Sequence, residues 1–250
     1  PNNPTQSIDT YIPGRYTGEI WGFESAGIAK TEDEMKAHLA KVNQDKLGSR
    51  WGAGDIMYKD LDGDGVISDG SRTLKDHGDV KVIGNTTPRY LFGLDLNASW
   101  KGFDVRAFFQ GIMKRDVWAG GNYLFGWASG DQWQAVGITG VRDYFRDENT
   151  WSVANGYQSV NLNSYLPRPD GSGKNAHTMD QYLLNAAYMR LKNFQVGYTL
   201  PKTITSKWGV SNLRVFFSAE NMFTITSMPS QFDPELVGTS TSSNNGYPLS

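Results

Sequence analysis

"RYLFGLDLNASWKGFDVRAFFQGIM" (residues 89–113) alternates apolar and polar residues in two runs that are joined by a short turn. Alternate residues from Tyr90 to Trp100 are apolar, and the same rhythm resumes from Phe103 to Met113. Because successive side chains of a strand point to opposite faces of a sheet, this period of two predicts a β-hairpin. The hairpin has one wide apolar face, which must lie against either a protein core or lipid.

The composition excludes several classes of protein. The chain has 250 residues, a formal net charge of -2, no cysteine and three histidines. It therefore lacks the basic character of nucleic-acid-binding proteins, and it can form neither disulfides nor thiolate metal sites. No apolar run approaches the roughly 18 residues that a membrane helix needs. A membrane β-barrel is not excluded, because its strands carry their lipid-facing residues in alternation.

Further strands and one helix are predicted along the chain. Thr31 with Glu34 forms a capping-box pattern, and a helix is expected at about 32–45. The parity of apolar residues changes inside the strand at 186–200, which predicts a bulge near Lys192 and Asn193. The other strands are expected at 14–27, 56–59, 80–84 and 213–225.

The connections between the long strands alternate in length. The long ones span about 24–88, 114–185 and 226 onward, and the short ones lie near 101 and at 201–212. Short turns at one end and long loops at the other are typical of outer-membrane barrels. A soluble sandwich more often has turns every 8 to 12 residues. The alternative that the pattern leaves open is a large soluble antiparallel sheet packed on another layer.

Several segments in order resemble one protein family. They are "GDIMYKDLDGDGVISDGSRT", "IGNTTPRYLFGLDLNASWKGFDVRAFFQG", "YMRLKNFQVGYTLP", "LRVFFSAENMFTIT" and "FDPE". Together they resemble the C-terminal part of the SusC/RagA-like TonB-dependent outer-membrane transporters of Bacteroidetes. The resemblance implies an all-β fold, namely a segment of a 22-stranded antiparallel transmembrane barrel with long external loops and a short helix.

The same resemblance implies how the chain works. Residues 1–250 would supply about five of the last six strands, without the plug domain or the final strand. It implies import of oligosaccharides or peptides at the cell outer membrane, with extracellular long loops, a SusD-like surface lipoprotein as lid and the TonB complex acting through the missing N-terminal part. The rest of the barrel must come from residues outside this sequence, because open strand edges are not tolerated in lipid. The residues expected to face lipid are Tyr90, Phe92, Leu94, Leu96, Val105, Phe109, Val215 and Phe217.

The stretch "DLDGDGVISDGS" (60–71) matches the beginning of a calcium-binding loop. Acidic residues stand at the first, third and fifth positions and a glycine at the sixth, and closely spaced carboxylates favour a hard cation such as Ca2+. The match weakens at the twelfth position, which is Ser71 where an acidic residue is expected. The other reading is a solvated acidic turn held by side-chain-to-backbone hydrogen bonds. The candidate metal ligands are Asp60, Asp62, Asp64, Val66, Asp69 and Ser71.

Aromatic residues in the long loops are candidates for stacking on sugar rings, and they are Trp118, Tyr123, Trp127 and Trp133. The alternative for each of them is local packing or contact with the lid protein. No nucleophile–base pattern, dinucleotide-binding motif or HExxH motif is present, so no catalytic residue is assigned and no enzyme is expected. The rival function is a soluble calcium-dependent carbohydrate-binding β module, which would bury the apolar strand faces inside protein.

Overall fold

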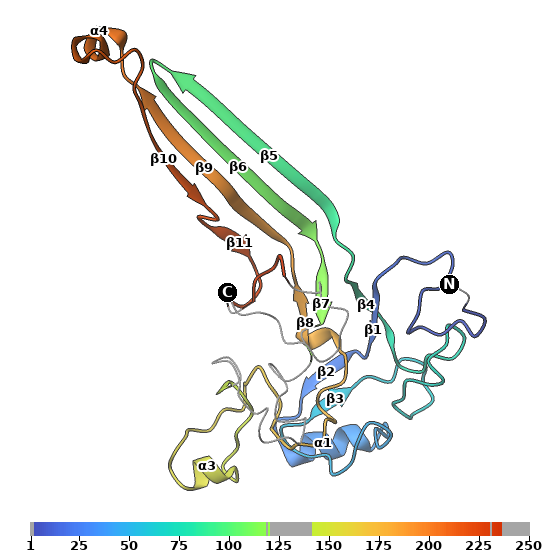
Figure 1. The fold of residues 1–250 in the computed structure, drawn as a ribbon. Helices are drawn as coiled ribbons and strands as arrows, with labels where there is room; N and C mark the ends of the chain where they lie inside the picture. Colours follow the sequence, from blue (N-terminus) through green and yellow to red (C-terminus); the bar gives the residue numbers. More distant parts are fainter. Residues whose placement is uncertain (1–2, 119, 121–141, 231, 237–250) are drawn as a thin grey trace. The chain divides into compact units, whose positions relative to one another are not determined.

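A computed structural model describes residues 3–118, 120, 142–230 and 232–236, and the chain divides into two compact units (Figure 1). Unit 1 comprises Pro1–Thr87, Val117–Leu184 and Gly238–Ser250, and unit 2 comprises Pro88–Asp116 and Asn185–Val237. The described residues are mostly strands with few short helices, which confirms the all-β class. None of these helices has the length and hydropathy of a membrane-spanning helix.

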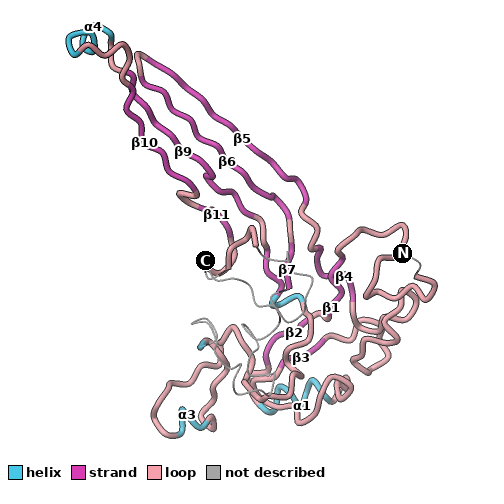
Figure 2. Tube along the Cα trace, in the orientation of Figure 1, coloured by secondary structure: helices cyan, strands magenta, loops and turns pink. Residues whose placement is uncertain are grey.

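Unit 2 is built on one antiparallel sheet, called here the long sheet (Figure 2). Its strand order is β10-β9-β6-β5, and the short strand β11 also pairs with β9. The predicted hairpin at 89–113 is therefore confirmed, with its two strands as immediate neighbours. The strands of the long sheet are β5 (Arg89–Trp100), β6 (Phe103–Lys114), β9 (Tyr188–Thr199), β10 (Arg214–Glu220) and β11 (Thr224–Thr226).

The two connections at one end of the long sheet are short. Lys101 and Gly102 join β5 to β6, and both have positive φ, at 46° and 89°. Two-residue hairpin turns of this kind match the twist of the flanking strands, and glycine adopts positive φ without strain. Between β9 and β10 the chain forms α4 (Lys202–Thr205) and η5 (Ser206–Trp208).

The predicted bulge is present in β9. The register between β6 and β9 shifts at Phe108 and Phe109, so that Phe108 pairs with Asn193 whereas Phe109 pairs with Leu191. Lys192 is the extra residue. The predicted strand at 213–225 is interrupted opposite this bulge, where Asn221 has a φ of 51°, and it becomes β10 and β11.

Unit 1 consists of short paired strands, small helices and long connections. The pairs are β1 with β4 and β2 with β3, and its helices include α1, α3 and η4. Its hydrophobic core gathers side chains from distant parts of the sequence, among them Ile8, Tyr58, Leu166 and Tyr182. The bounds are β1 (Glu19–Gly22), β2 (Ser25–Ile28), α1 (Glu32–Leu39), β3 (Ile56–Tyr58), β4 (Lys81–Asn85), α3 (Trp151–Ala154) and η4 (Asp180–Tyr182). The paired strands β7 (Asp116–Trp118) and β8 (Leu183–Asn185) each have residues in both units.

Two sequence predictions need correction. The strand expected at 14–27 is split into β1 and β2, which pair within unit 1, so the long sheet has four long strands and β11 rather than five long strands. The helix expected at 32–45 ends at Leu39, and beyond it the backbone of Asn43 is hydrogen-bonded to Gly65 and Ile67 instead of continuing the helix. The start of this helix is as predicted, because the Thr31 hydroxyl accepts a hydrogen bond from the Glu34 amide.

A buried carboxylate ties two distant connections of unit 1 together. Asp55 is fully buried and accepts hydrogen bonds from Arg168, Lys174, Asn175 and the backbone N–H of Gly52. The Lys174 ammonium is itself buried and lies 2.9 Å from the Asp55 carboxylate. Buried charges persist in proteins when they are paired and fully hydrogen-bonded, as these are. The cluster holds the segment around residues 49–58 against residues 166–175.

Candidate functional site: a two-faced sheet and an acidic loop

The register of the long sheet places its apolar residues on one side in regular rows. The row at the hairpin end contains Trp100, Phe103, Tyr198 and Val215, and each further row continues across the strands in the same way. This side, called the apolar face, therefore extends without a break over all the strands of the sheet. Its other rows are Ala98–Val105–Val196–Phe217, Leu96–Ala107–Phe194–Ala219, Leu94–Phe109–Leu191 and Phe92–Gly111–Met189–Ile225.

The apolar face is open along most of its length. Leu94 is 47% exposed, Phe103 50% and Phe217 57%. A sheet of a water-soluble protein normally has its apolar side covered by a second layer of helices or strands. No such layer covers these side chains within the part of the chain that the structure describes.

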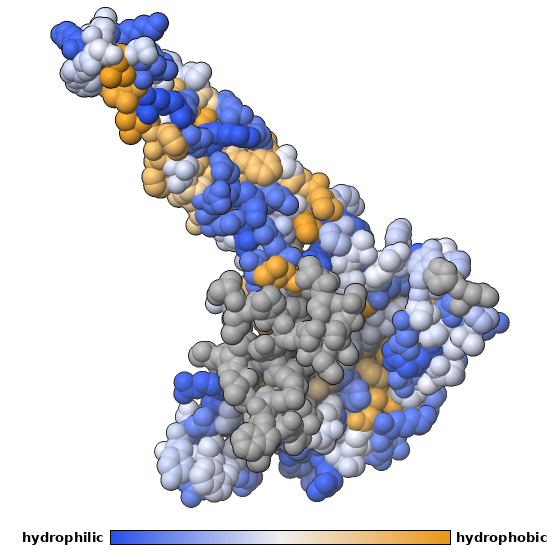
Figure 3. All heavy atoms as spheres, in the orientation of Figure 1, coloured by the Kyte–Doolittle hydropathy of each residue, from blue (hydrophilic) through white to orange (hydrophobic). Residues whose placement is uncertain are grey.

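The opposite side of the long sheet, called the polar face, carries hydrogen-bonded charges. Arg106 on β6 pairs with Asp95 on β5 at 2.6 Å, and Arg214 on β10 pairs with Asp104 on β6. Hydrophilic residues (blue) follow the sheet in Figure 3. The apolar rows contain no charged residue, whereas the polar face carries these ion pairs, as in a barrel wall that has lipid on one side and water on the other.

A second group of ion pairs fastens the segment after β11 to β9. Arg190 on β9 lies 2.8 Å from Asp233 and 3.0 Å from Glu235, and Lys192 lies 3.1 Å from Glu235. These carboxylates belong to the "FDPE" motif. The bulge therefore has a structural role, because it lets Lys192 bind the Glu235 carboxylate that Arg190 already binds.

The predicted lipid-facing residues lie on the apolar face, with the exception of Tyr90. Phe92 and Phe109, for example, occupy neighbouring rows of that face. Tyr90 has a φ of 56°. In the register between β5 and β6, Arg89 is opposite Lys114 and Leu91 is opposite Ile112, so Tyr90 is skipped. Its position at the end of β5 is therefore irregular, and the register does not assign it to either face.

The acidic loop of unit 1 brings three carboxylates together. One oxygen from each of Asp60, Asp62 and Asp79 lies within 4.8 Å of the other two. Asp79 is fully buried, and its two oxygens accept the N–H groups of Leu61 and Ser68. Burial raises the pKa of Asp79, and the nearby Asp62 carboxylate acts in the same direction, while the backbone N–H groups of Ser68, Leu61 and Asp62 oppose them. These three side chains could hold a hard cation through oxygen ligands.

Three of the other predicted metal ligands interact with other groups. Asp69 pairs with Arg72 at 3.0 Å, and the Ser71 hydroxyl lies 3.3 Å from that of Thr73. Asp64 accepts the N–H of Val66, as in a turn stabilised by its own side chain. Sequence spacing missed Asp79, because it lies well beyond the 60–71 stretch and only the fold brings it back to the loop.

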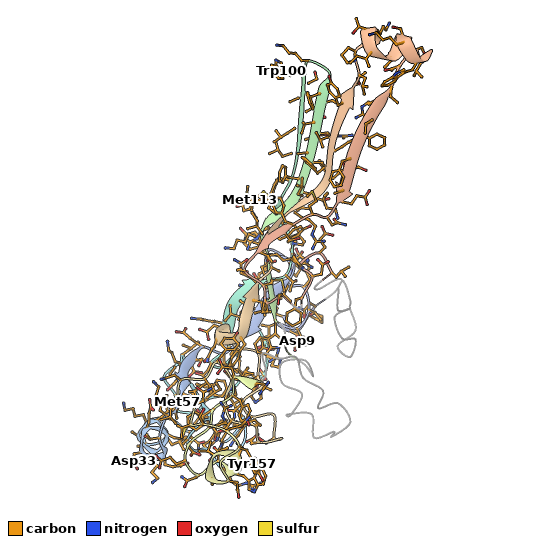
Figure 4. All side chains as sticks on the ribbon, turned by 90° about the vertical axis from the view of Figure 1, so that its left-hand side faces the viewer. Asp9, Asp33, Met57, Trp100, Met113 and Tyr157 are labelled. Atoms are coloured by element: carbon orange, nitrogen blue, oxygen red, sulfur yellow. The ribbon has the colours of Figure 1, made fainter. Side chains whose placement is uncertain are left out.

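The predicted sugar-stacking residues are mostly untested. Tyr123, Trp127 and Trp133 lie outside the described residues, and Trp118 packs against the core of unit 1. A different aromatic pair is open to solvent. Trp151 and Tyr157, the latter labelled in Figure 4, stack with their ring centroids 5.4 Å apart and are 71% and 72% exposed.

Comparisons with known proteins agree with the resemblance seen in the motifs. No protein-family model matches the sequence. Among curated proteins, the TonB-dependent receptor P3 of Formosa agariphila is 27% identical over 89% of this chain and 19% of its own length. The TonB-dependent receptor P26 of the same organism is 23% identical over 84% of this chain and 18% of its own length.

Solved structures of a RagAB peptide importer are also similar to the chain. In the open-open state the identity is 22%, with a TM-score of 0.49, over 90% of this chain and 21% of that one. A second RagAB peptide transporter structure gives the same identity and TM-score over 85% of this chain and 20% of that one.

The chain spans about a fifth of the length of the curated relatives it matches. Those relatives are TonB-dependent receptors, and the similarity covers most of this chain. The chain is therefore a relative of the TonB-dependent receptors, as its motifs predicted.

Proposed function

We propose that this chain forms part of the wall and the external loops of a TonB-dependent importer in the cell outer membrane. The observation that supports this best is the apolar face of the long sheet. Leu94 and Val105 lie in its middle rows and are 47% and 37% exposed. In a soluble protein these positions would be dry and covered, whereas in a barrel wall they face hydrocarbon.

The chain needs more strands to form a barrel. In the described residues, β5 and β10 are the two edges of the long sheet. Each unpaired backbone group costs several kcal/mol in hydrocarbon, so both edges need neighbouring strands from the rest of the protein. The curated relatives are about five times as long as the matched region, which leaves ample chain for the remaining strands and a plug.

The orientation in the membrane follows from the lengths of the connections. The Lys101–Gly102 turn and the 201–213 connection lie at the same end of the sheet, and short connections are periplasmic in outer-membrane barrels. The connections that make up unit 1 would then be extracellular. They would contact the cargo and a SusD-like lipoprotein lid.

The cargo is proposed to be an oligosaccharide or a peptide. The chain would bind it beneath the lid, and movement of the plug by the TonB complex would admit it. No chemical step is assigned to the chain. Its curated relatives are receptors rather than enzymes, which supports a role without catalysis.

A structural Ca2+ ion in the acidic loop is a second part of the proposal. Asp60 and Asp62 would bind it as predicted, and Asp79 would take the place that Asp69 or Ser71 was expected to fill. The ion would offset the repulsion between three adjacent carboxylates. It would stabilise an extracellular loop rather than take part in transport.

The proposal is tested with the full-length receptor in its native host. We expect it in the outer-membrane fraction, released by detergent but not by alkaline carbonate, and we expect uptake of a labelled glycan or peptide pool to require TonB. Release by carbonate without detergent would overturn the proposal and favour the soluble carbohydrate-binding module. Membrane retention without any TonB-dependent uptake would overturn the importer function alone.

A further inference from the structure

Two connections form one end of the long sheet, and we call them together the basic tip. They are the β5–β6 turn and the segment from Lys202 to Val210. The N–H of Thr199 donates to the carbonyl of Gly102 at 2.8 Å, and the N–H of Leu200 donates to the carbonyl of Leu213 at 2.9 Å. These bonds hold both connections at the same edge of the sheet. Trp100, labelled in Figure 4, marks this end.

The basic tip is folded rather than extended. The side chain of Thr205 is buried. The N–H of Val210 donates a hydrogen bond to the carbonyl of Thr205 at 3.2 Å. Gly209 ends η5 with a φ of 68°, a conformation that glycine adopts without strain. The segment therefore presents its exposed side chains from a defined scaffold.

The charge of the basic tip has one sign. Lys101, Lys202 and Lys207 are exposed, and neither connection contains an aspartate or glutamate. None of the three lysines forms an ion pair with another residue that the structure describes. Lys101 instead lies over the ring of Trp100, with its ammonium 4.8 Å from the ring centroid.

Large apolar side chains stand among these lysines. Trp100 is 70% exposed, Trp208 62% and Ile204 43%. Trp100 also begins the apolar face, in the row that continues through Phe103 and Tyr198, whose rings lie 4.4 Å apart. The basic tip thus combines indole rings and ammonium groups at the end of the apolar face.

This combination of side chains matches the chemical groups at a bilayer surface. Indole rings favour the boundary between acyl chains and headgroups, and lysines bind anionic headgroups while their stems remain in the apolar layer. We propose that the basic tip binds the anionic headgroups of the phospholipid leaflet at this end of the barrel. The proposal rests on the membrane orientation proposed above, and it names a lipid class that this surface prefers.

The test uses the full-length receptor in nanodiscs of phosphatidylcholine alone, or of equal parts phosphatidylcholine and phosphatidylglycerol. A bimane label on the Ser206→Cys variant reports on the basic tip, and a label on Leu94→Cys reports on the apolar face. A nitroxide on the lipid headgroup quenches the first label, and a nitroxide in the acyl chain quenches the second. Any native cysteine is removed beforehand.

We expect headgroup quenching at position 206 to rise about twofold or more in the phosphatidylglycerol discs, because each lysine near an anionic surface favours contact by roughly fivefold. The variant K101Q/K202Q/K207Q should lose that rise and keep the acyl-chain quenching at position 94. Equal headgroup quenching in both lipids, with normal quenching at position 94, would overturn the headgroup proposal alone. Absence of acyl-chain quenching at position 94 would instead overturn the membrane orientation.

Discussion

Arg214 on β10 reaches Asp104 on β6 across the intervening strand β9, with its Nε 3.0 Å from the carboxylate. The residue between them is Gly197, which pairs with Asp104 on one side and Phe216 on the other. A Cβ atom at position 197 would stand 2.5 Å from the Arg214 guanidinium. The absence of a side chain at Gly197 therefore allows one ion pair to link three strands.

The first prediction concerns this ion pair. Gly197→Ala should give the full-length receptor a lower thermal midpoint than Gly93→Ala does, since the added Cβ displaces Arg214 from Asp104. Gly93 is a matched control on the polar face, because an added Cβ there comes no closer to a neighbour than 3.4 Å, the distance to the Phe108 ring. Thermal unfolding in detergent measures the difference. In an Asp104→Asn background the two alanine variants should differ no longer, and a difference that persists there would refute the explanation.

The long sheet could be predicted from the sequence, because its signal is local. Alternation fixes the face of each residue, and a change of parity at Lys192 revealed the bulge that the register shows. Unit 1 could not be predicted in the same way. Its core joins Ile8 to Leu166, and its acidic loop is completed by Asp79, so the contacts that decide its fold lie far apart in the sequence.

The prediction of one strand at 14–27 was wrong for the same reason, because its pairing partner lies far away in the sequence. Its apolar residues include Ile20 and Trp21, which are compatible with either a barrel wall or a small sheet. Pairing with β4 decides the outcome, with Trp21 opposite Val82. A short apolar run carries no information about its partner, so neither strand order nor the number of strands in the long sheet followed from it.

The second prediction tests the side of the sheet that contacts lipid. Phe109→Arg should destabilise the receptor in lipid by about 2–4 kcal/mol, because an arginine near the bilayer midplane is costly on the lipid face. Phe92→Arg should behave alike. Phe108→Arg is the matched control, since Phe108 is the preceding residue of β6 and pairs with Asp95 on the polar face. Folding yield and urea midpoint in phospholipid vesicles measure the effect, and equal losses for positions 109 and 108 would contradict the assignment of faces.

The third prediction concerns the acidic loop. Ca2+ should raise the thermal midpoint of the receptor, since a ligand that binds only the folded state stabilises it. Asp62→Asn should remove that increase, because Asp62 is exposed and its one hydrogen bond to a described residue is to the N–H of Asp64. Asp69→Asn should keep the increase, as Asp69 pairs with Arg72 instead. Terbium luminescence measures binding directly, and its loss in Asp69→Asn as well as in Asp62→Asn would restore the ligand set expected from spacing.

The last prediction concerns the buried pair that joins the two connections of unit 1. Asp55→Asn removes the negative charge beside the Lys174 ammonium, which is 1% exposed, and breaking such a pair costs about 3–5 kcal/mol. Asp170→Asn is the matched control, because Asp170 also lies 3.0 Å from Lys174 but is 20% exposed. Hydrogen exchange should therefore accelerate in residues 49–58 and 166–175 of the Asp55 variant, with little change in the long sheet. Equal acceleration in the two variants would show that Asp55 is not the main partner of this lysine.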